Sequence, residues 1–265
     1  MIKVAGFARP SGITFIGPKY QVTTRDTPKG IFIQHRTNPK AMHRPNFIGK
    51  LPLVRGAYVF VSMIVSMIVS NNIAIKIFLI LWLGMGFILG LPSRTKETIE
   101  TTNKALITIN LFDIALLLFM ATAIILFKSL WQYHAAEHMS INTYESGQTL
   151  SIKNIRQSSR ISPRCGSNIV VIYTLIQFII ISLLHIYIFP YLGALIGFAI
   201  AYEIYLWRVK PLLWVGKLFQ KYLVTQKPED YHLLIGSIGL EALISLEENG
   251  KLPNEYTSIT ESMPS

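Results

Sequence analysis

The chain has 265 residues, a formal net charge of +11 and one cysteine, Cys165. Hydrophobic residues make up 51% and charged residues 15%, against about a quarter charged in typical soluble domains, so the composition argues against a soluble protein. One cysteine excludes an internal disulfide, and because the basic residues flank apolar runs as in cytoplasmic juxtamembrane segments, we expect no nucleic-acid partner.

Residues 1–55 form a basic N-terminal region with ten Lys or Arg and one Asp. Glycine and proline are scattered through it, and the runs GITFIG and GIFIQH are β-prone. We expect a small irregular or β-hairpin region on the cytoplasmic surface of a membrane. The first 25 residues lack acids, as transit peptides do, which leaves an organellar location open.

Residues 56–207 are the predicted transmembrane domain. The apolar runs 105–127 and 168–190 are each long enough to span a bilayer, 191–207 is a shorter third candidate, and 56–91 supplies one or two crossings. One crossing there places residues 1–55, the loop 128–167 and segment 208–227 on the same side, as the positive-inside rule favours. We therefore predict an all-α, multi-pass integral membrane protein with about four transmembrane helices and cytoplasmic termini, located in a bacterial plasma membrane or, alternatively, an organellar one.

The residues after the last predicted span form amphipathic helices. The sequence RVKPLLWVGKLFQKYLV places apolar residues at helical spacing with lysine on the other side, which is typical of an interfacial helix. A turn at Pro228 precedes a second predicted helix at 231–248. The remaining residues, 249–265, are expected to form a flexible tail.

The stretch WQYHAAEHMSINTYE, residues 131–145, carries the candidate chemistry. His134 and His138 lie four residues apart and share a face if this stretch is helical. Asn142 and Glu145 continue that face before a natural stop at Gly147. Imidazole nitrogen and carboxylate oxygen are ligands that zinc accepts.

The same stretch matches the H-x-x-E-H pattern of inverted zincins. This pattern predicts a divalent metal, zinc foremost, bound by His134, His138 and Glu145, with Glu137 as the general base that activates a bound water. A plainer interpretation also stays open. The histidines would then sit in the headgroup region at a helix end, and Glu137 would pair with an arginine, namely Arg156, Arg160 or Arg164.

Two further polar residues stay open in their roles. Cys165 is a fourth ligand, a reactive thiol or an inert cysteine at the membrane interface. Asp113 lies inside a predicted span, where an acid is either functional or satisfied by a neighbouring helix. Glu203 and His185 lie in the next two spans, and we expect them to form hydrogen bonds between helices.

The block YHAAEHMSINTYE, followed by IRQSSRISPRCGSN, resembles the YqhQ family of bacterial multispanning membrane proteins, which are often labelled metal-dependent enzymes. GFARPSGITFIGP, LPLVRG and TQKPEDYHLLIGSIGLEAL are similar to further family segments. The chain departs from the family at two positions. Ser11 stands where the family usually has Glu, and Ser162 stands where it usually has His. If either group is essential to the family's chemistry, this chain is a divergent or inactive member.

Together these features predict a metal-dependent hydrolase that acts on a lipid or membrane-bound substrate at the surface of the lipid bilayer. The alternative is a non-enzymatic membrane protein. It would be a scaffold, an assembly factor or a transporter whose polar face contacts a lipid or membrane-protein partner.

Overall fold

The computed structural model describes residues 1–37, 48–69, 127–178, 190–253 and 260–262, together with Lys76, Ile80 and Tyr256. The chain divides into two compact units, which are described separately. The sheet unit comprises Met1–His43, Ala115–Ser167 and Val215–Ser265, and the helical unit comprises Arg44–Ile114 and Asn168–Trp214. Each unit is therefore assembled from chain segments that are distant in sequence.

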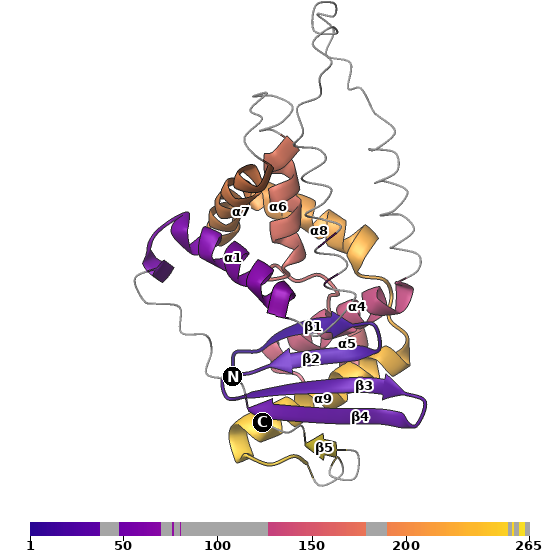
Figure 1. Ribbon diagram of the computed structural model, residues 1–265. Helices are drawn as coiled ribbons and strands as arrows, with labels where there is room; N and C mark the ends of the chain where they lie inside the picture. The colour runs from indigo at the N-terminus through magenta and orange to yellow at the C-terminus, as the bar shows by residue number, and fades with distance from the viewer. Residues whose placement is uncertain are drawn as a thin grey trace, which may run out of the picture. The chain divides into compact units, whose positions relative to one another are not determined.

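The sheet unit contains a sheet of four antiparallel strands in chain order, shown in indigo and violet in Figure 1: β1 (Ala5–Arg9), β2 (Gly12–Ile16), β3 (Tyr20–Thr27) and β4 (Gly30–Thr37). Two-residue loops join β1 to β2 and β3 to β4. A fifth short strand, β5 (Thr260–Ser262), pairs in parallel with β4 and lies within the predicted flexible tail.

The prediction of an all-α protein is wrong, because residues 5–37 form this sheet. Alternation explains the strands: Ile13 and Phe15 of β2 point to one face and are fully buried, and Val22 and Ile33 continue that face on β3 and β4. The β-prone runs GITFIG and GIFIQH do lie in strands, but the apolar stretches elsewhere in the chain determined the predicted fold class.

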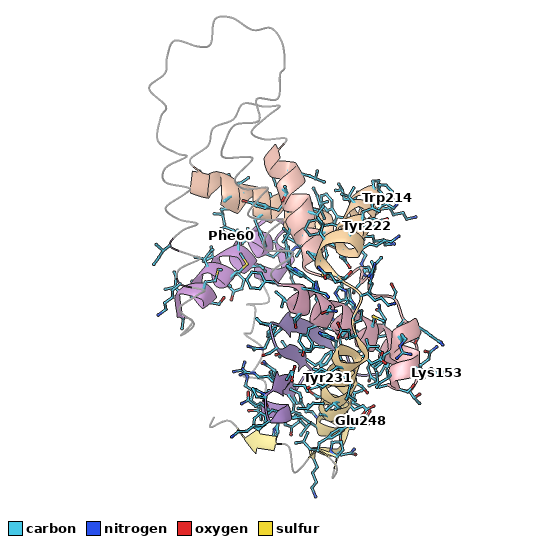
Figure 2. All side chains as sticks on the ribbon, turned by 90° about the vertical axis from the view of Figure 1, so that its right-hand side faces the viewer. Phe60, Lys153, Trp214, Tyr222, Tyr231 and Glu248 are labelled. Carbon is cyan, nitrogen blue, oxygen red and sulfur yellow. The ribbon has the colours of Figure 1, made fainter. Side chains whose placement is uncertain are left out.

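The sheet unit also contains helices α4 (Lys128–Glu145), α5 (Ile152–Gln157) and α9 (Asp230–Asn249), together with the residues from Val215 that precede α9. α4 contacts β1 and β2, and α9 runs across β2 and β3. Figure 2 shows Tyr231 and Glu248 near the two ends of α9. Gly239 permits the close approach of α9 to the sheet, because an added Cβ would lie 2.4 Å from Thr24 Oγ1. α9 confirms the helix predicted at 231–248.

The helical unit contains α1 (Val54–Val69), α7 (Pro190–Leu206) and, from Asn168 onward, α6 (Ser167–Phe178), and the short 3-10 helix η1 (Ile48–Lys50) precedes α1. α1 approaches α7 closely at Gly56, where an added Cβ would lie 2.8 Å from the Cα of Ala199. The carboxylate of Glu203 on α7 is buried, pairs with Arg55 and accepts the N–H of Leu53 at 3.0 Å. Glu203 therefore forms the helix-to-helix hydrogen bonds that the sequence predicted for it.

After α7 the chain continues into α8 (Lys210–Phe219) and a π-helical turn, η3 (Gln220–Val224), which together cover the predicted amphipathic helix. Among the described residues, no single helix has both the length and the apolar character needed to cross a membrane. Leu192–Leu206 and Lys210–Val224 meet that test only when taken together as a bent pair. Residues 105–126, with Asp113, and residues 179–189, with His185, lie outside the described part of the chain.

Candidate metal centre

α4 presents one polar face to the chain segment that returns past it. This return segment, residues 158–166, contacts each residue of the predicted polar face. His138 forms a hydrogen bond with the backbone carbonyl of Arg160, and Glu145 forms an ion pair with Arg164. Between them, Asn142 donates from Nδ2 to the carbonyls of Ser159 (2.7 Å) and Ile161 (3.2 Å). The helix ends at Glu145 and Gly147 follows with a φ of +74°, so the predicted helix stop is confirmed.

Backbone carbonyls fix the tautomer of both histidines. His134 Nδ1 lies 2.8 Å from the carbonyl oxygen of Val224, and His138 Nδ1 lies 2.8 Å from that of Arg160. A carbonyl oxygen accepts hydrogen bonds and never donates them, so each Nδ1 carries the hydrogen and each Nε2 keeps its lone pair. The same arrangement orients histidines that bind metals in proteins.

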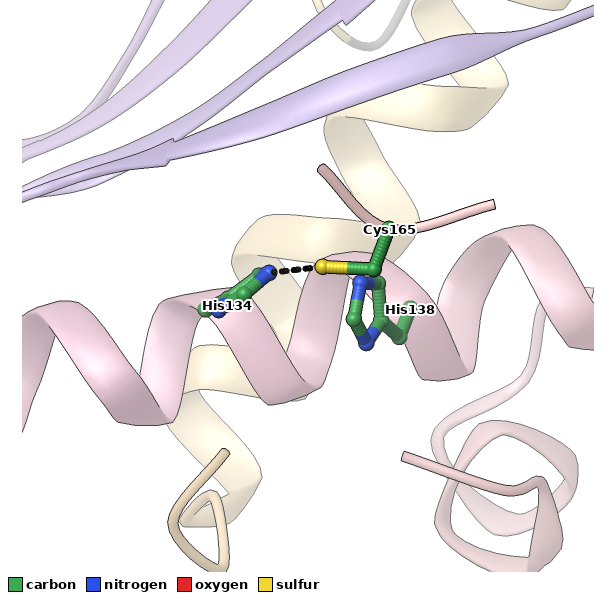
Figure 3. Close-up of side chains that lie close together, drawn as sticks. All are labelled: His134, His138 and Cys165. Atoms are coloured by element: carbon green, nitrogen blue, oxygen red, sulfur yellow. Dashed lines mark hydrogen bonds between the residues drawn. The ribbon is translucent and has the colours of Figure 1, made fainter. Parts of the chain in front are cut away.

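Cys165 of the return segment completes a group of three potential ligands. Its Sγ lies 3.3 Å from His134 Nε2, as the dashed line in Figure 3 marks, and one ligand atom from each of His134, His138 and Cys165 lies within 4.8 Å of the other two. Ligands of a tetrahedral zinc lie roughly 3.3–3.7 Å apart, as follows from metal–ligand distances of about 2.0–2.3 Å. The group can therefore hold a metal with only small side-chain adjustments.

Glu137 lies beside this group, whereas Glu145 does not join it. A carboxylate oxygen of Glu137 is 3.5 Å from His138 Nε2, and the residue is 4% exposed. Gly6 of β1 makes room for it, because an added Cβ there would lie 2.6 Å from Glu137 Oε1. Glu145 follows His138 by seven residues, which places it about 10 Å further along the helix axis. There its carboxylate pairs with Arg164.

Burial dominates the electrostatics of the group. It lowers the pKa of His134, against the opposing hydrogen bond to the Val224 carbonyl, and lowers the pKa of His138 to about 4 with help from neighbouring His134. Burial also raises the pKa of Glu137 to about 8, against the pull of Arg164. At neutral pH both imidazoles are therefore uncharged, which is the form that binds metals.

The Cys165 thiol is influenced by burial and by Ser167. Burial raises its pKa, while the backbone N–H of Ser167 (3.4 Å) and its hydroxyl (3.0 Å) donate to Sγ and oppose that rise. The two donors would stabilise a thiolate once a cation is present, since a bound metal deprotonates a coordinating thiol.

A cavity of about 520 Å³ opens onto these side chains. Three elements of the sheet unit supply its wall: residues 3–8 with β1, one face of α4, and the end of the return segment up to Ser167. His134, Glu137, His138 and Cys165 are all among the lining residues. The group is thus accessible to a small molecule or a chain segment.

Sequence reasoning missed two residues that support the centre. Gln220 is fully buried and joins the return segment, with Oε1 accepting the Ser162 N–H (2.9 Å) and Nε2 donating to the Ser162 carbonyl (3.0 Å). Gly6 admits Glu137 to the face of β1. No sequence signal marks Gln220, because its partner is 58 residues away. Gly6 lies in the GFARPSG motif, but the motif does not reveal what the glycine accommodates.

Comparison with known proteins matches residues 54–246 to the family described as "Protein of unknown function (DUF1385)". Over 90 residues the chain is 37% identical to "Uncharacterized protein YqhQ" of Bacillus subtilis (strain 168), a match that covers 32% of this chain and 28% of that protein. No solved structure matches the chain. Because the family match covers well over half of the sequence and includes α4, the return segment and most of α9, the chain belongs to the YqhQ/DUF1385 family.

Proposed function

We propose that this protein is a metal-dependent hydrolase in which His134, His138 and Cys165 hold a zinc ion and Glu137 is the general base. The main support is the group of three ligand atoms within 4.8 Å of one another, with both histidines oriented by backbone carbonyls. Two imidazoles and a thiolate suit zinc, and three protein ligands are typical of catalytic zinc sites, which leave one position open.

A zinc ion bound there would acidify a water molecule and polarise a carbonyl or phosphoryl oxygen. Glu137 would take the proton from the attacking water at its carboxylate and deliver it to the leaving group. Its raised pKa of about 8 describes the metal-free site, and a nearby divalent cation would lower it by favouring the carboxylate. The cavity then has to exclude bulk water while it admits the substrate.

Cysteine chemistry is a second candidate, because Cys165 Sγ lies 3.3 Å from His134 Nε2, within reach of a proton transfer. Burial raises the pKa of the thiol, however, which works against a thiolate nucleophile in the metal-free protein. The cysteine candidate also gives no role to His138 or Glu137. Fast alkylation of Cys165 by iodoacetamide at pH 7, unaffected by zinc, would favour it over the metal.

The membrane location, the lipid bilayer as a partner and the non-enzymatic scaffold all stay predictions. A scaffold has no need for a buried carboxylate next to a group of metal-ligand residues, and the metal content therefore separates it from a hydrolase.

The test is elemental analysis of protein purified without chelator. Wild-type protein should carry about one zinc per chain, and His138→Ala and Cys165→Ser should lose it, because a three-ligand site left with two holds zinc poorly. Glu137→Gln should keep the metal. Glu145→Gln is the matched control and should also keep it, since Glu145 pairs with Arg164.

Two outcomes would contradict this proposal. Wild-type protein without stoichiometric transition metal, even after incubation with one equivalent of zinc, would remove the metal centre. Loss of zinc in Glu145→Gln but not in Cys165→Ser would restore the ligand set with Glu145 that the sequence suggested.

A further inference from the structure

Strand β1 is an outer strand of the sheet. Among the described strands it pairs with β2, and its other edge is unpaired. The two-residue loop makes Arg9 and Gly12 the closing pair of the β1–β2 hairpin. Because antiparallel pairing alternates along a strand, the N–H and C=O groups of Gly6 and Ala8 are directed to the unpaired edge.

The cavity of the metal centre runs along this edge. Its lining includes the consecutive residues 3–8, whose side chains alternate between the two faces of the sheet. A cavity lined by both faces of a strand follows the edge of that strand. The same cavity is lined by His134, Glu137 and Cys165, so strand β1 and the metal-ligand group border one space.

We propose that an extended peptide segment binds to the edge of β1 as an added strand and that its backbone continues through the cavity to the metal centre. This inference rests on the proposed function for the reaction itself. Water would add across a peptide bond of the segment, giving a carboxylate and an amine, and Glu137 would transfer the proton from the water to the departing nitrogen. The substrate would then be an unfolded or flexible stretch of protein.

The edge favours a peptide over a lipid. An unpaired strand edge offers alternating donors and acceptors, which another backbone can match and an acyl chain cannot. Apolar residues of α4 also line the cavity and suit alternate side chains of an added strand: Leu130, Trp131 and Ile141.

The probe is a fluorescein-labelled pool of octapeptides with randomised sequence, acetylated at the N-terminus and amidated at the C-terminus. Binding is followed by fluorescence anisotropy with the full-length protein carrying Glu137→Gln, so that no turnover occurs. In this parent, the further substitution Ala8→Pro removes the N–H at the open edge but keeps Cβ. It should weaken peptide binding about fivefold, as expected for the loss of one hydrogen bond. Ala8→Gly keeps the N–H and should bind within about twofold of the parent.

A second probe removes the same donors from the ligand. The pool with every amide N-methylated keeps the side chains but cannot pair with a strand edge, and it should bind at least tenfold more weakly, as expected for the loss of two or more hydrogen bonds. This arm is informative even if Ala8→Pro fails to fold.

Equal binding of the two pools would overturn the inference. So would binding of phosphatidylglycerol vesicles that displaces the peptides, or a dimer that Ala8→Pro converts to monomer without any peptide binding. Zinc content is measured on the same samples. Peptide binding that depends on the N–H groups in a protein without zinc would overturn the proposed hydrolase and leave the peptide site standing.

Discussion

The carboxyl group of Glu137 is almost fully buried, against the face of β1 and beside two uncharged imidazoles. Its folded pKa of about 8 lies above the ordinary value, so the folded metal-free protein binds the proton more tightly than the unfolded chain does. Stability contributed by this proton is fully present below the unfolded pKa and is lost as the pH rises through the folded pKa.

Glu137→Gln should therefore abolish this loss. Between pH 5 and pH 8 the unfolding free energy of metal-free wild-type protein should fall by roughly 1–3 kcal/mol more than that of Glu137→Gln. Urea denaturation at both pH values in the presence of a chelator measures the difference. Parallel pH profiles of the two proteins would show that Glu137 is not buried as a protonated acid.

Gly6 is the second residue with a specific steric role. In Gly6→Ala the new methyl group would meet Glu137 Oε1, and we expect a destabilisation of about 1–3 kcal/mol, as for other overpacked sites. Gly49→Ala is the control, because nothing lies within 4 Å of an added Cβ there. In a Glu137→Ala background, Gly6→Ala should cost little. Equal costs in both backgrounds would mean that the methyl group clashes with something else.

At the scale of elements, helix α4 was predictable in the part that carries the histidines. Two histidines four residues apart on a helix share a face whatever surrounds them, and in the structure their rings lie with centroids 4.4 Å apart and planes inclined by 58°. For the third member, Cys165, the sequence left three roles open, because 26 residues separate it from His138 and their path is not visible in the sequence. The sequence placed Glu145 on the correct face but could not show that Arg164 holds its carboxylate at the far end of the helix.

The fold class was the larger error of the sequence-based prediction, because the sheet was not expected to define the fold. GITFIG and GIFIQH indicated β-structure, and both lie in strands, yet the fold class was set by the apolar stretches elsewhere. Each of the strands β1 to β4 has eight residues or fewer. The buried face of these strands depends on α4 and α9, which follow more than 90 residues later in the chain. Helix α9 was foreseen because its pattern extends over a longer stretch.

The return segment links the elements of the site, and Gln220 fixes it from outside the metal-ligand group. Gln220→Leu should lower zinc affinity by about tenfold, as for other residues that orient ligands without touching the metal, while far-UV circular dichroism stays unchanged. Gln148→Leu changes an exposed glutamine and should leave the affinity unaltered. Competition with a zinc-binding dye measures both. Unchanged affinity in Gln220→Leu would mean that the return segment keeps its course without the buried amide.

At the scale of the whole molecule, three segments far apart in sequence build the sheet unit, and each contributes to the site. β1 supplies Gly6 and the open edge, and α4 with the return segment supplies the metal-ligand group and Glu137. Gln220 and Val224 come from the third segment. The hydrogen bond from His134 Nδ1 to the Val224 carbonyl joins the second and third segments, so a metal held by His134 would be linked to both. The site is thus a property of the assembled unit and not of the H-x-x-E-H motif alone.

Zinc X-ray absorption spectroscopy of the wild-type protein loaded with one equivalent of zinc tests the metal centre most directly. The structure predicts one sulfur neighbour at about 2.3 Å and two or more nitrogen or oxygen neighbours at about 2.0–2.1 Å. The sulfur contribution must vanish in Cys165→Ser, because Cys165 is the chain's one cysteine. A wild-type spectrum with nitrogen and oxygen neighbours alone, or with the six-oxygen shell of free aqueous zinc, would contradict the ligand set of His134, His138 and Cys165.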